Sequence, residues 1–290
     1  MIELCGMRLR HRVINGSGCF DALAALRVFG EAMLDDFPFA AYVSKTITLA
    51  PREGNPPPRL WEAAAGLVNS IGLPNRGLAA YLEHDLPSLA ALPVPLITNV
   101  MGSTREEVGE LVAALADSDR VGAIELNVSC PNVATGLDIG ADPGELEALL
   151  RRVRPLTRKP LIVKLTPNTA DVGACAAAAE AGGADAVSLI NTLRARVIAP
   201  GGSAPWLGGG NGGLSGPAIR LVALAQVSRV AERVAIPIVG MGGIVTGRDA
   251  REMLDAGATV VAVGTESFRD PAAGTRIARE LEAGITQIAR

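Results

Sequence analysis

The sequence predicts an α/β protein built as a single (β/α)8 barrel with a long insertion after the second strand. Short apolar segments alternate with helical patterns along most of the chain, which is typical of a parallel sheet covered by helices. Eight such segments favour a closed barrel over an open doubly wound sheet. Although 290 residues would also suit two domains, barrels of this kind often use about 250 residues as one domain, so one domain over 1–290 is expected.

Composition excludes several classes of protein and site. The net charge is −3 and the basic residues are scattered, so no footprint for nucleic acid is present. Cys5, Cys19, Cys130 and Cys175 lie far apart without a CxxC pair, which argues against zinc, a disulfide framework and an iron–sulfur cluster within this chain. No metal site is expected. Because the sequence shows neither a leader segment nor a window of about 18 apolar residues, we expect a soluble, cytoplasmic protein.

The alternation fixes the expected elements. Strands are predicted at 12–17, 40–46, 95–100, 123–128, 161–165, 186–191, 236–240 and 259–263, and helices at 22–34, 104–116, 142–153, 170–181, 217–231, 247–256 and 270–288. Residues 47–87 break the pattern, and three consecutive prolines predict irregular backbone through much of this segment. The glycine-rich stretch 201–216 suits a flexible linker by composition, but its place at the barrel mouth favours a ligand-covering loop.

Functional side chains should gather where the strands end, because in this barrel all carboxyl ends face one mouth. The strand ends carry Ser44-Lys45-Thr46, Asn99, Asn127, Lys164, Asn191-Thr192, Gly242-Gly243 and Gly264-Thr265. A lone lysine at a strand end is most often a solvated charge. Lys164 is more informative, since its strand LIVKL is otherwise apolar and a buried ammonium requires an anionic or hydrogen-bonding partner.

The two glycine pairs follow the seventh and eighth strands, where barrels frequently bind phosphate on backbone N–H groups. Tight turns that need glycine for positive φ are the alternative. Two pairs at the two positions used for phosphate favour the binding interpretation.

Cys130 stands in the segment ELNVSCPN, where an apolar strand ends in a cluster of polar and reactive side chains. Pro131 stops the strand and fixes the loop, so the thiol is a candidate base or nucleophile. Free cysteine usually acts as a small apolar filler. Two amides, a hydroxyl and a proline within a few residues favour the functional interpretation here.

Taken together, the chain resembles the catalytic flavin subunit of class 1 dihydroorotate dehydrogenases, most closely class 1B. The resemblance rests on SKTITLAPREGNPPPR (44–59), NSIGLPNRG (69–77), ELNVSCPN (125–132), VKLTPN (163–168), INT (190–192), GGLSGPAI (212–219), GMGGI (240–244) and VGTE (263–266). Cys130 points to class 1, because class 2 enzymes have serine there. The segments 15–30 and 61–70 match less closely.

The resemblance implies an FMN enzyme that oxidises (S)-dihydroorotate to orotate in the de novo synthesis of UMP. Cys130 would take the C5 proton while hydride leaves C6 for the flavin N5. FMN would contact Ser17, Lys45, Thr46, Asn99, Asn127, Lys164, Ile190, Gly216, Gly242, Gly243, Gly264 and Thr265. Dihydroorotate would contact Lys45, Asn69, Ser70, Ile71, Gly72, Leu73, Asn127, Asn191 and Thr192.

Class 1B resemblance further implies a partner subunit with FAD and a [2Fe-2S] cluster that passes electrons to NAD, on a homodimeric core that forms a heterotetramer. A fumarate-linked class 1A enzyme stays open as an acceptor alternative. A flavoprotein similar to dihydropyrimidine dehydrogenase, or a flavin- or pyrimidine-binding protein without turnover, are the alternative functions.

Overall fold

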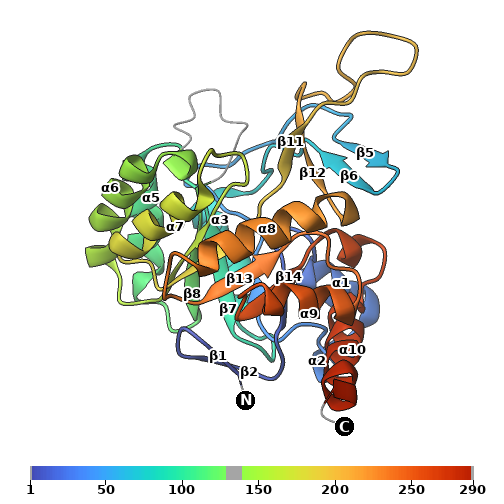
Figure 1. The fold of residues 1–290 in the computed structure, drawn as a ribbon. Coiled ribbons are helices and arrows are strands. Elements are labelled where there is room, and N and C mark those ends of the chain that lie inside the picture. Colours follow the sequence, from blue (N-terminus) through green and yellow to red (C-terminus); the bar gives the residue numbers. More distant parts are fainter. Residues whose placement is uncertain (1, 129–138, 289–290) are drawn as a thin grey trace.

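Eight parallel strands form the centre of the molecule in the computed structural model, which describes residues 2–128 and 139–288 (Figure 1). They are β3 (Val13–Asn15), β4 (Tyr42–Val43), β7 (Leu96–Val100), β8 (Ala123–Asn127), β9 (Leu161–Lys164), β10 (Ala186–Leu189), β13 (Ile238–Met241) and β14 (Val260–Val263). Their hydrogen-bonded order is β3-β14-β13-β10-β9-β8-β7-β4. The predicted barrel is confirmed, with strands shorter than the sequence pattern suggested.

The first and last strands of this order meet at a seam that uses one side chain. The Ala40 N–H donates to the Val13 carbonyl at 2.9 Å. The Asn15 amide then bonds the Val43 backbone twice, since Nδ2 donates to the Val43 carbonyl and the Val43 N–H donates to Oδ1, both at 2.8 Å. The side chain of Asn15 thus replaces the backbone hydrogen-bond ladder that would otherwise join β3 and β4.

Helices cover the outside of the barrel. They are α1 (Ala22–Phe29), α2 (Ala32–Asp35), α5 (Arg105–Ala116), α6 (Pro143–Val153), α7 (Val172–Ala181), α8 (Arg220–Ala231), α9 (Gly247–Asp255) and α10 (Ala273–Ile288), with short turns η2 (Ile139–Ala141), η3 (Arg154–Leu156), η4 (Pro217–Ile219) and η5 (Thr265–Phe268). Side-chain caps start several of them: Thr104, Asp142 and Asp171 each accept a backbone N–H, and Thr246 forms a capping box with Asp249. No helix in these two ranges is both long and apolar enough to cross a membrane.

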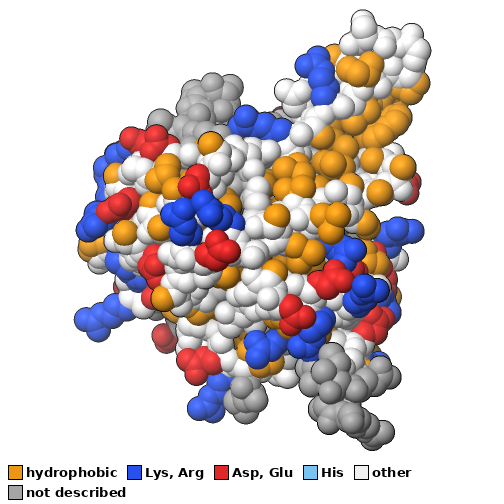
Figure 2. All heavy atoms as spheres, in the orientation of Figure 1, with side chains coloured by type: hydrophobic (Ala, Val, Ile, Leu, Met, Phe, Trp, Pro, Cys, Tyr) orange, Lys and Arg blue, Asp and Glu red, His pale blue; other side chains and the backbone are white. Residues whose placement is uncertain are grey.

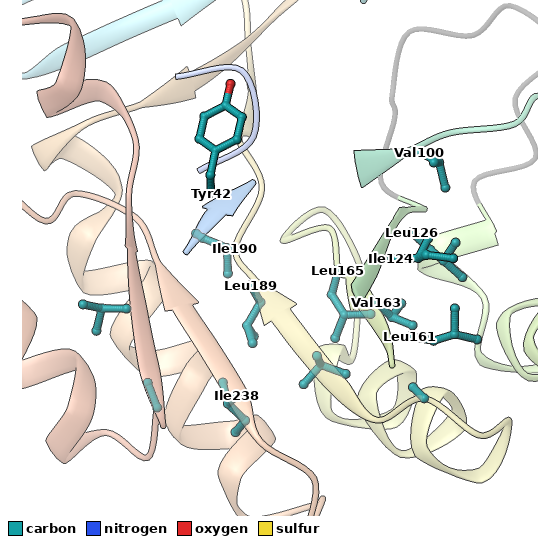
Figure 3. Packing of buried hydrophobic residues seen from close by; sticks show 14 of the residues in the cluster. Tyr42, Val100, Ile124, Leu126, Leu161, Val163, Leu165, Leu189, Ile190 and Ile238 are labelled. Carbon is teal, nitrogen blue, oxygen red and sulfur yellow. The ribbon is translucent and has the colours of Figure 1, made fainter. Parts of the chain in front are cut away.

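Strand side chains alternate between two buried faces. The outward set, which includes Ile124, Leu126, Leu161 and Val163, packs against the helices (Figure 3). The inward set forms a second cluster inside the barrel, with Ile97, Ala123, Ile162 and Ala186 among its members. A two-stranded hairpin, β1 (Ile2–Leu4) and β2 (Met7–Leu9), adds Leu4, Met7 and Leu9 to that cluster and closes the amino-terminal end of the barrel.

A four-stranded antiparallel sheet rises beside the opposite end, the mouth of the barrel (Figure 1). Its order is β11 (Leu193–Ala195), β12 (Gly212–Ser215), β6 (Gly66–Asn69) and β5 (Leu60–Ala63). Trp61 meets Trp206 edge to face at 5.6 Å between ring centroids, and apolar side chains gather along this arm in Figure 2. Over the helical surface in that view, acidic and basic side chains are mixed.

The structure refines one expectation and corrects two. Residues 47–59 hold no helix or strand, as predicted, whereas the rest of the insertion carries β5, β6, α3 (Gly77–Ala80), the π-helical turn η1 (Tyr81–Asp85) and α4 (Leu86–Leu89). The stretch 201–216 is not wholly a loop, because β12 occupies its end. The helix expected at 22–34 breaks at Gly30, whose φ of 69° is available to glycine at little steric cost.

Candidate active site at the barrel mouth

A polar layer lies inside the barrel directly above the apolar one. Asn99, Glu125, Lys164 and Ser188 each stand two residues after Ile97, Ala123, Ile162 and Ala186, so they share the inner face of their strands. All four are buried, with Glu125 only 3% and Lys164 only 7% exposed. Among neighbouring strands the register pairs Asn99 with Glu125 and Asn127 with Lys164. Four strands therefore bring their polar ends together beneath the mouth.

Glu125 and Asn99 are joined by a short hydrogen bond, in which Asn99 Nδ2 donates to Glu125 Oε1 at 2.6 Å. Burial raises the pKa of the Glu125 carboxyl, and the nearby Lys164 ammonium together with the Asn99 bond opposes that rise. The other end of the Asn99 amide, Oδ1, is buried without a hydrogen-bond partner in the described part of the chain. A buried carbonyl oxygen left in this way is a position where a ligand N–H fits.

Lys45 and Lys164 place two ammonium groups close enough to affect each other. Burial lowers the pKa of Lys45, with a further lowering by Lys164, while Cys19 opposes it. The thiol of Cys19 faces both lysines: burial raises its pKa and the two positive charges counteract that rise. A Cβ on Gly18 would stand 3.0 Å from the Lys45 Nζ, so the loop after β3 lies directly on this ammonium. The mouth thus offers two positive charges to an anionic ligand.

Ser17 and Thr46 lie beside each other on the same side of the mouth. Ser17 Oγ donates to the Ser44 carbonyl at 2.8 Å and lies 3.3 Å from Thr46 Oγ1. Thr46 is buried, and the Ser44 hydroxyl accepts the backbone N–H of Asn99 at 3.0 Å. The two predicted cofactor contacts that follow β3 and β4 are therefore adjacent in space.

The predicted phosphate-binding glycines also converge. A Cβ on Gly243 would come within 3.0 Å of the Gly216 carbonyl, and one on Gly216 would lie 3.5 Å from Thr265 Cγ2. Gly216, Gly242 and Gly243 have positive φ values of 89°, 130° and 71°. Thr265 Oγ1 donates to Ser215 Oγ at 2.8 Å. Backbone N–H groups of glycines, which have no side chain to cover them, lie here beside the hydroxyls of Ser215 and Thr265. Such an arrangement is suited to binding phosphate oxygens.

Two remaining predicted cofactor residues border this glycine group. A Cβ on Gly242 would lie 3.3 Å from Ile190 Cγ1. Gly264 lies on the other side, where an added Cβ would be 3.5 Å from Cys19 Sγ. The glycine group is thereby continuous with the loop that carries Cys19 and with the two lysines.

The predicted substrate residues lie where the mouth sheet meets the barrel. Asn69 Nδ2 donates to the Gly213 carbonyl at 3.3 Å, and Gly213 packs so tightly on Thr192 that an added Cβ would overlap the Thr192 hydroxyl. Asn191 Oδ1 accepts the Thr192 N–H at 2.9 Å. Asn69, Asn191 and Thr192 are therefore brought together by β6, β12 and the end of β10.

The segment 70–73 is held by Asn55. Asn55 Nδ2 donates to Ser70 Oγ at 3.0 Å, and the Asn55 N–H donates to the Ile71 carbonyl at 3.0 Å. Gly72 and Leu73 both have positive φ, of 74° and 55°. The left-handed conformation at Leu73 is uncommon outside glycine and is typical of functional loops held by their surroundings.

Cys130 lies outside the described residues, so the structure gives no position for the predicted base. Sequence reasoning missed four residues that the structure places in the site: Cys19, Asn55, Glu125 and Ser215. For Glu125 a signal was present in the sequence. Its strand AIELN places one charged residue among apolar ones, as the strand LIVKL does with Lys164. The other three are brought in by contacts between distant segments and left no local pattern.

Comparison with known proteins agrees with this geometry. The family model described as dihydroorotate dehydrogenase matches residues 1–285. The catalytic subunit of dihydroorotate dehydrogenase B (NAD(+)) from Citrifermentans bemidjiense is 46% identical over 97% of this chain and 91% of its own length, and that from Desulforudis audaxviator is 44% identical over 99% and 92%. A protein of Solibacter usitatus, provisionally described as dihydroorotate dehydrogenase A (fumarate), is 43% identical over 96% and 90%. The match over almost the whole chain, on a barrel with lysines, amides and glycines gathered at its mouth, leads to one conclusion: the chain belongs to the dihydroorotate dehydrogenase family.

Proposed function

We propose that this chain is the FMN-containing catalytic subunit that oxidises (S)-dihydroorotate to orotate in pyrimidine synthesis. The observation that carries the proposal is the pair of the buried Lys164 ammonium and the unpartnered Asn99 oxygen, which lie on the two strands that flank Glu125. Lys164 makes no hydrogen bond to another residue of the described ranges. Such a charge is costly to bury, and an anionic cofactor with ring N–H and carbonyl groups would satisfy both side chains.

The residues present fit FMN. Its phosphate would be held by backbone N–H groups and hydroxyls at one end of the site, namely Gly216, Gly242, Gly243, Gly264 and Thr265. Its ring system would be held at the other end by Ser17, Lys45, Thr46, Asn99, Asn127, Lys164 and Ile190. When bound, FMN supplies the acceptor for the two electrons that leave the substrate as hydride. The lysines stabilise negative charge near the ring.

Substrate would be oriented by Lys45, Asn127 and the group Asn69, Ser70, Ile71, Gly72, Leu73, Asn191 and Thr192. Lys45 supports binding of a carboxylate because its ammonium is desolvated and pairs with no acidic side chain in the described ranges. Asparagine amides suit the fixed donors and acceptors of a pyrimidine ring. Cys130 would remove the proton from C5, and in the sequence it follows three residues after the end of β8, the strand that carries Asn127 and Glu125.

For the electron acceptor we infer a partner subunit that contains FAD and a [2Fe-2S] cluster and reduces NAD, in a heterotetramer on a homodimeric core in the cytoplasm. Support comes from relatives such as those of Citrifermentans bemidjiense and Desulforudis audaxviator, which are named as catalytic subunits of NAD(+)-linked enzymes. Copurification from the native cell tests the inference. A homogeneous barrel that reduces NAD fully without a second polypeptide would contradict it, and reduction of fumarate would place the enzyme with the fumarate-linked type.

The first test is the visible spectrum of the purified chain before and after anaerobic addition of L-dihydroorotate. We expect a yellow protein that bleaches. A yellow protein that stays yellow with dihydroorotate but bleaches with another dihydropyrimidine would overturn the substrate, and a colourless protein that cannot be reconstituted with FMN would overturn the cofactor.

Replacement of the predicted base gives a second test. Cys130→Ala should retain FMN and slow flavin reduction by about 10²- to 10⁴-fold, the usual contribution of a positioned base. Stopped-flow absorbance under anaerobic conditions measures this rate. Cys175→Ala is the matched control, since Cys175 is a buried thiol on α7 in the outer cluster that packs against the helices, and the reduction rate of this variant should equal that of the unmodified chain.

A further inference from the structure

Glu125 has no role in the proposed chemistry, yet it occupies the centre of the polar layer. It is 3% exposed, and it lies on the inner face of β8 one strand away from both Asn99 on β7 and Lys164 on β9. Burial of a carboxyl in the barrel interior costs free energy unless hydrogen bonds and nearby opposite charge compensate for the lost hydration. Its neighbours in the barrel show what task these interactions perform.

The task concerns the orientation of the Asn99 amide. An asparagine amide can present either its oxygen or its nitrogen in a given direction, and the two choices differ in whether the ligand meets an acceptor or a donor. Here Nδ2 is occupied by Glu125 at 2.6 Å, and the backbone N–H of Asn99 is occupied by Ser44. Oδ1 therefore points away from Glu125 and stays free in the described ranges.

An ionised carboxylate enforces this choice because it only accepts hydrogen bonds. Burial works against ionisation, but the ammonium of Lys164 supports it, so the two inner-face residues act together. We propose that Glu125 is a positioning residue that holds the Asn99 carbonyl oxygen toward the cofactor and serves as counter-ion to Lys164. The proposal rests on the proposed FMN site and assigns no contact between Glu125 and the cofactor itself.

A glutamine at position 125 would remove the constraint while it preserves shape. Its amide can accept from Asn99 Nδ2 or donate to Asn99 Oδ1, so neither orientation of Asn99 is favoured, and the negative charge near Lys164 is lost. Reduced flavin carries more negative charge than oxidised flavin. Removal of a carboxylate from its surroundings should therefore shift the reduction potential of the bound cofactor upward.

The test is a thermodynamic cycle with Glu125→Gln, Asn99→Ala and the double variant. FMN dissociation constants come from fluorescence titration of the FMN-free chains, and reduction potentials come from dye-equilibrated titration of the reconstituted chains. We expect about tenfold weaker FMN binding for each single variant, no further loss in the double variant, and an upward potential shift for Glu125→Gln.

Thr98→Val is the matched control, because Thr98 lies beside Asn99 on β7 but faces outward, where it bonds the Tyr81 hydroxyl at 2.8 Å. Loss of the Thr98 hydroxyl should lower the free energy of unfolding and leave both the FMN affinity and the reduction potential of bound FMN unchanged. Additive losses in the double variant, or a Glu125→Gln chain with unchanged affinity and potential, would overturn the positioning role. If the unmodified chain binds no FMN, the proposed function fails instead, so the two failures are distinguishable. Were Glu125→Gln not to fold, Glu125→Asp would replace it, with a shorter reach to Asn99 and the same expected loss of affinity.

Discussion

The two ends of the barrel are built from the same strands but have opposite chemistry. At the amino-terminal end, Ile97, Ala123, Ile162 and Ala186 pack against the β1–β2 hairpin in an apolar plug. Two residues further along each strand, the same inner face carries Asn99, Glu125, Lys164 and Ser188. Because side chains alternate with a period of two, one step of alternation separates an apolar layer that stabilises the fold from the polar layer proposed to bind the cofactor. Substitutions in the two layers should therefore affect stability and binding differently.

The largest effect on folding should come from the plug. Leu9 is 1% exposed, and Leu9→Ala would leave a cavity that costs about 2–5 kcal/mol in free energy of unfolding. Urea denaturation of the FMN-free chain measures this, with Arg8→Ala on the exposed side of the same strand as control. FMN affinity of the folded fraction should not change. A loss of affinity as large as the loss of stability would show that the two ends are coupled.

The polar layer should respond in the opposite way. Lys164→Met removes the buried ammonium, and we expect FMN binding to weaken by about 10- to 100-fold, since hydrogen bonds to charged groups contribute about 1.5–3 kcal/mol. The thermal midpoint of the FMN-free chain should change little, because the removal of a costly buried ammonium is offset by the loss of the positive charge beside Glu125. Fluorescence titration and circular dichroism measure the two quantities. An FMN-free chain that melts markedly earlier, with unchanged affinity, would show that Lys164 is structural.

The smallest effect is a pH dependence at the plugged end. His11 lies between β2 and β3, its Nδ1 accepts the Val13 N–H, and burial together with Arg10 lowers its pKa from 6.5 to about 4. Since the folded-state pKa lies below the unfolded one, the stabilisation is complete above pH 6.5 and is lost as pH falls toward 4. Urea midpoints at pH 7 and 5 should differ less in His11→Gln than in the unmodified chain. The exposed His84 is the control, and His84→Gln should keep the full difference.

The barrel itself was predictable from sequence, whereas the mouth was predictable only in part. Alternating apolar runs gave all eight strands, because each run is local and its period is readable. The sheet at the mouth was not readable, since β6 pairs with β12 across more than a hundred residues, and its fit depends on glycines such as Gly66, whose Cβ would overlap the Ser215 carbonyl. The prolines nearby predicted irregular backbone through much of this segment.

Within the site, a residue could be predicted when its position in an apolar strand required a partner. Lys164 was predicted because a charge in an apolar strand needs a partner, and the same argument applied to Glu125 would have found the partner one strand away. Cys19 could not be found in this way, because only the fold brings its loop against Lys45 and Lys164. The assignment of individual contacts to FMN and dihydroorotate stays a prediction.

The seam between β3 and β4 has a consequence for motion. Other neighbouring strands are joined by ladders, whereas this pair depends on the Ala40 N–H and on the amide of Asn15. Separation of these two strands at the mouth breaks these three hydrogen bonds and the bond from Ser17 to the Ser44 carbonyl, and it leaves every ladder in the sheet intact. Ser17 and Lys45 follow directly after the two strands, so breathing of the barrel at its weakest junction would widen the mouth on the side of the lysines. The junction between β3 and β4 therefore depends largely on one asparagine side chain, and it lies on the side of the mouth that carries Ser17 and Lys45.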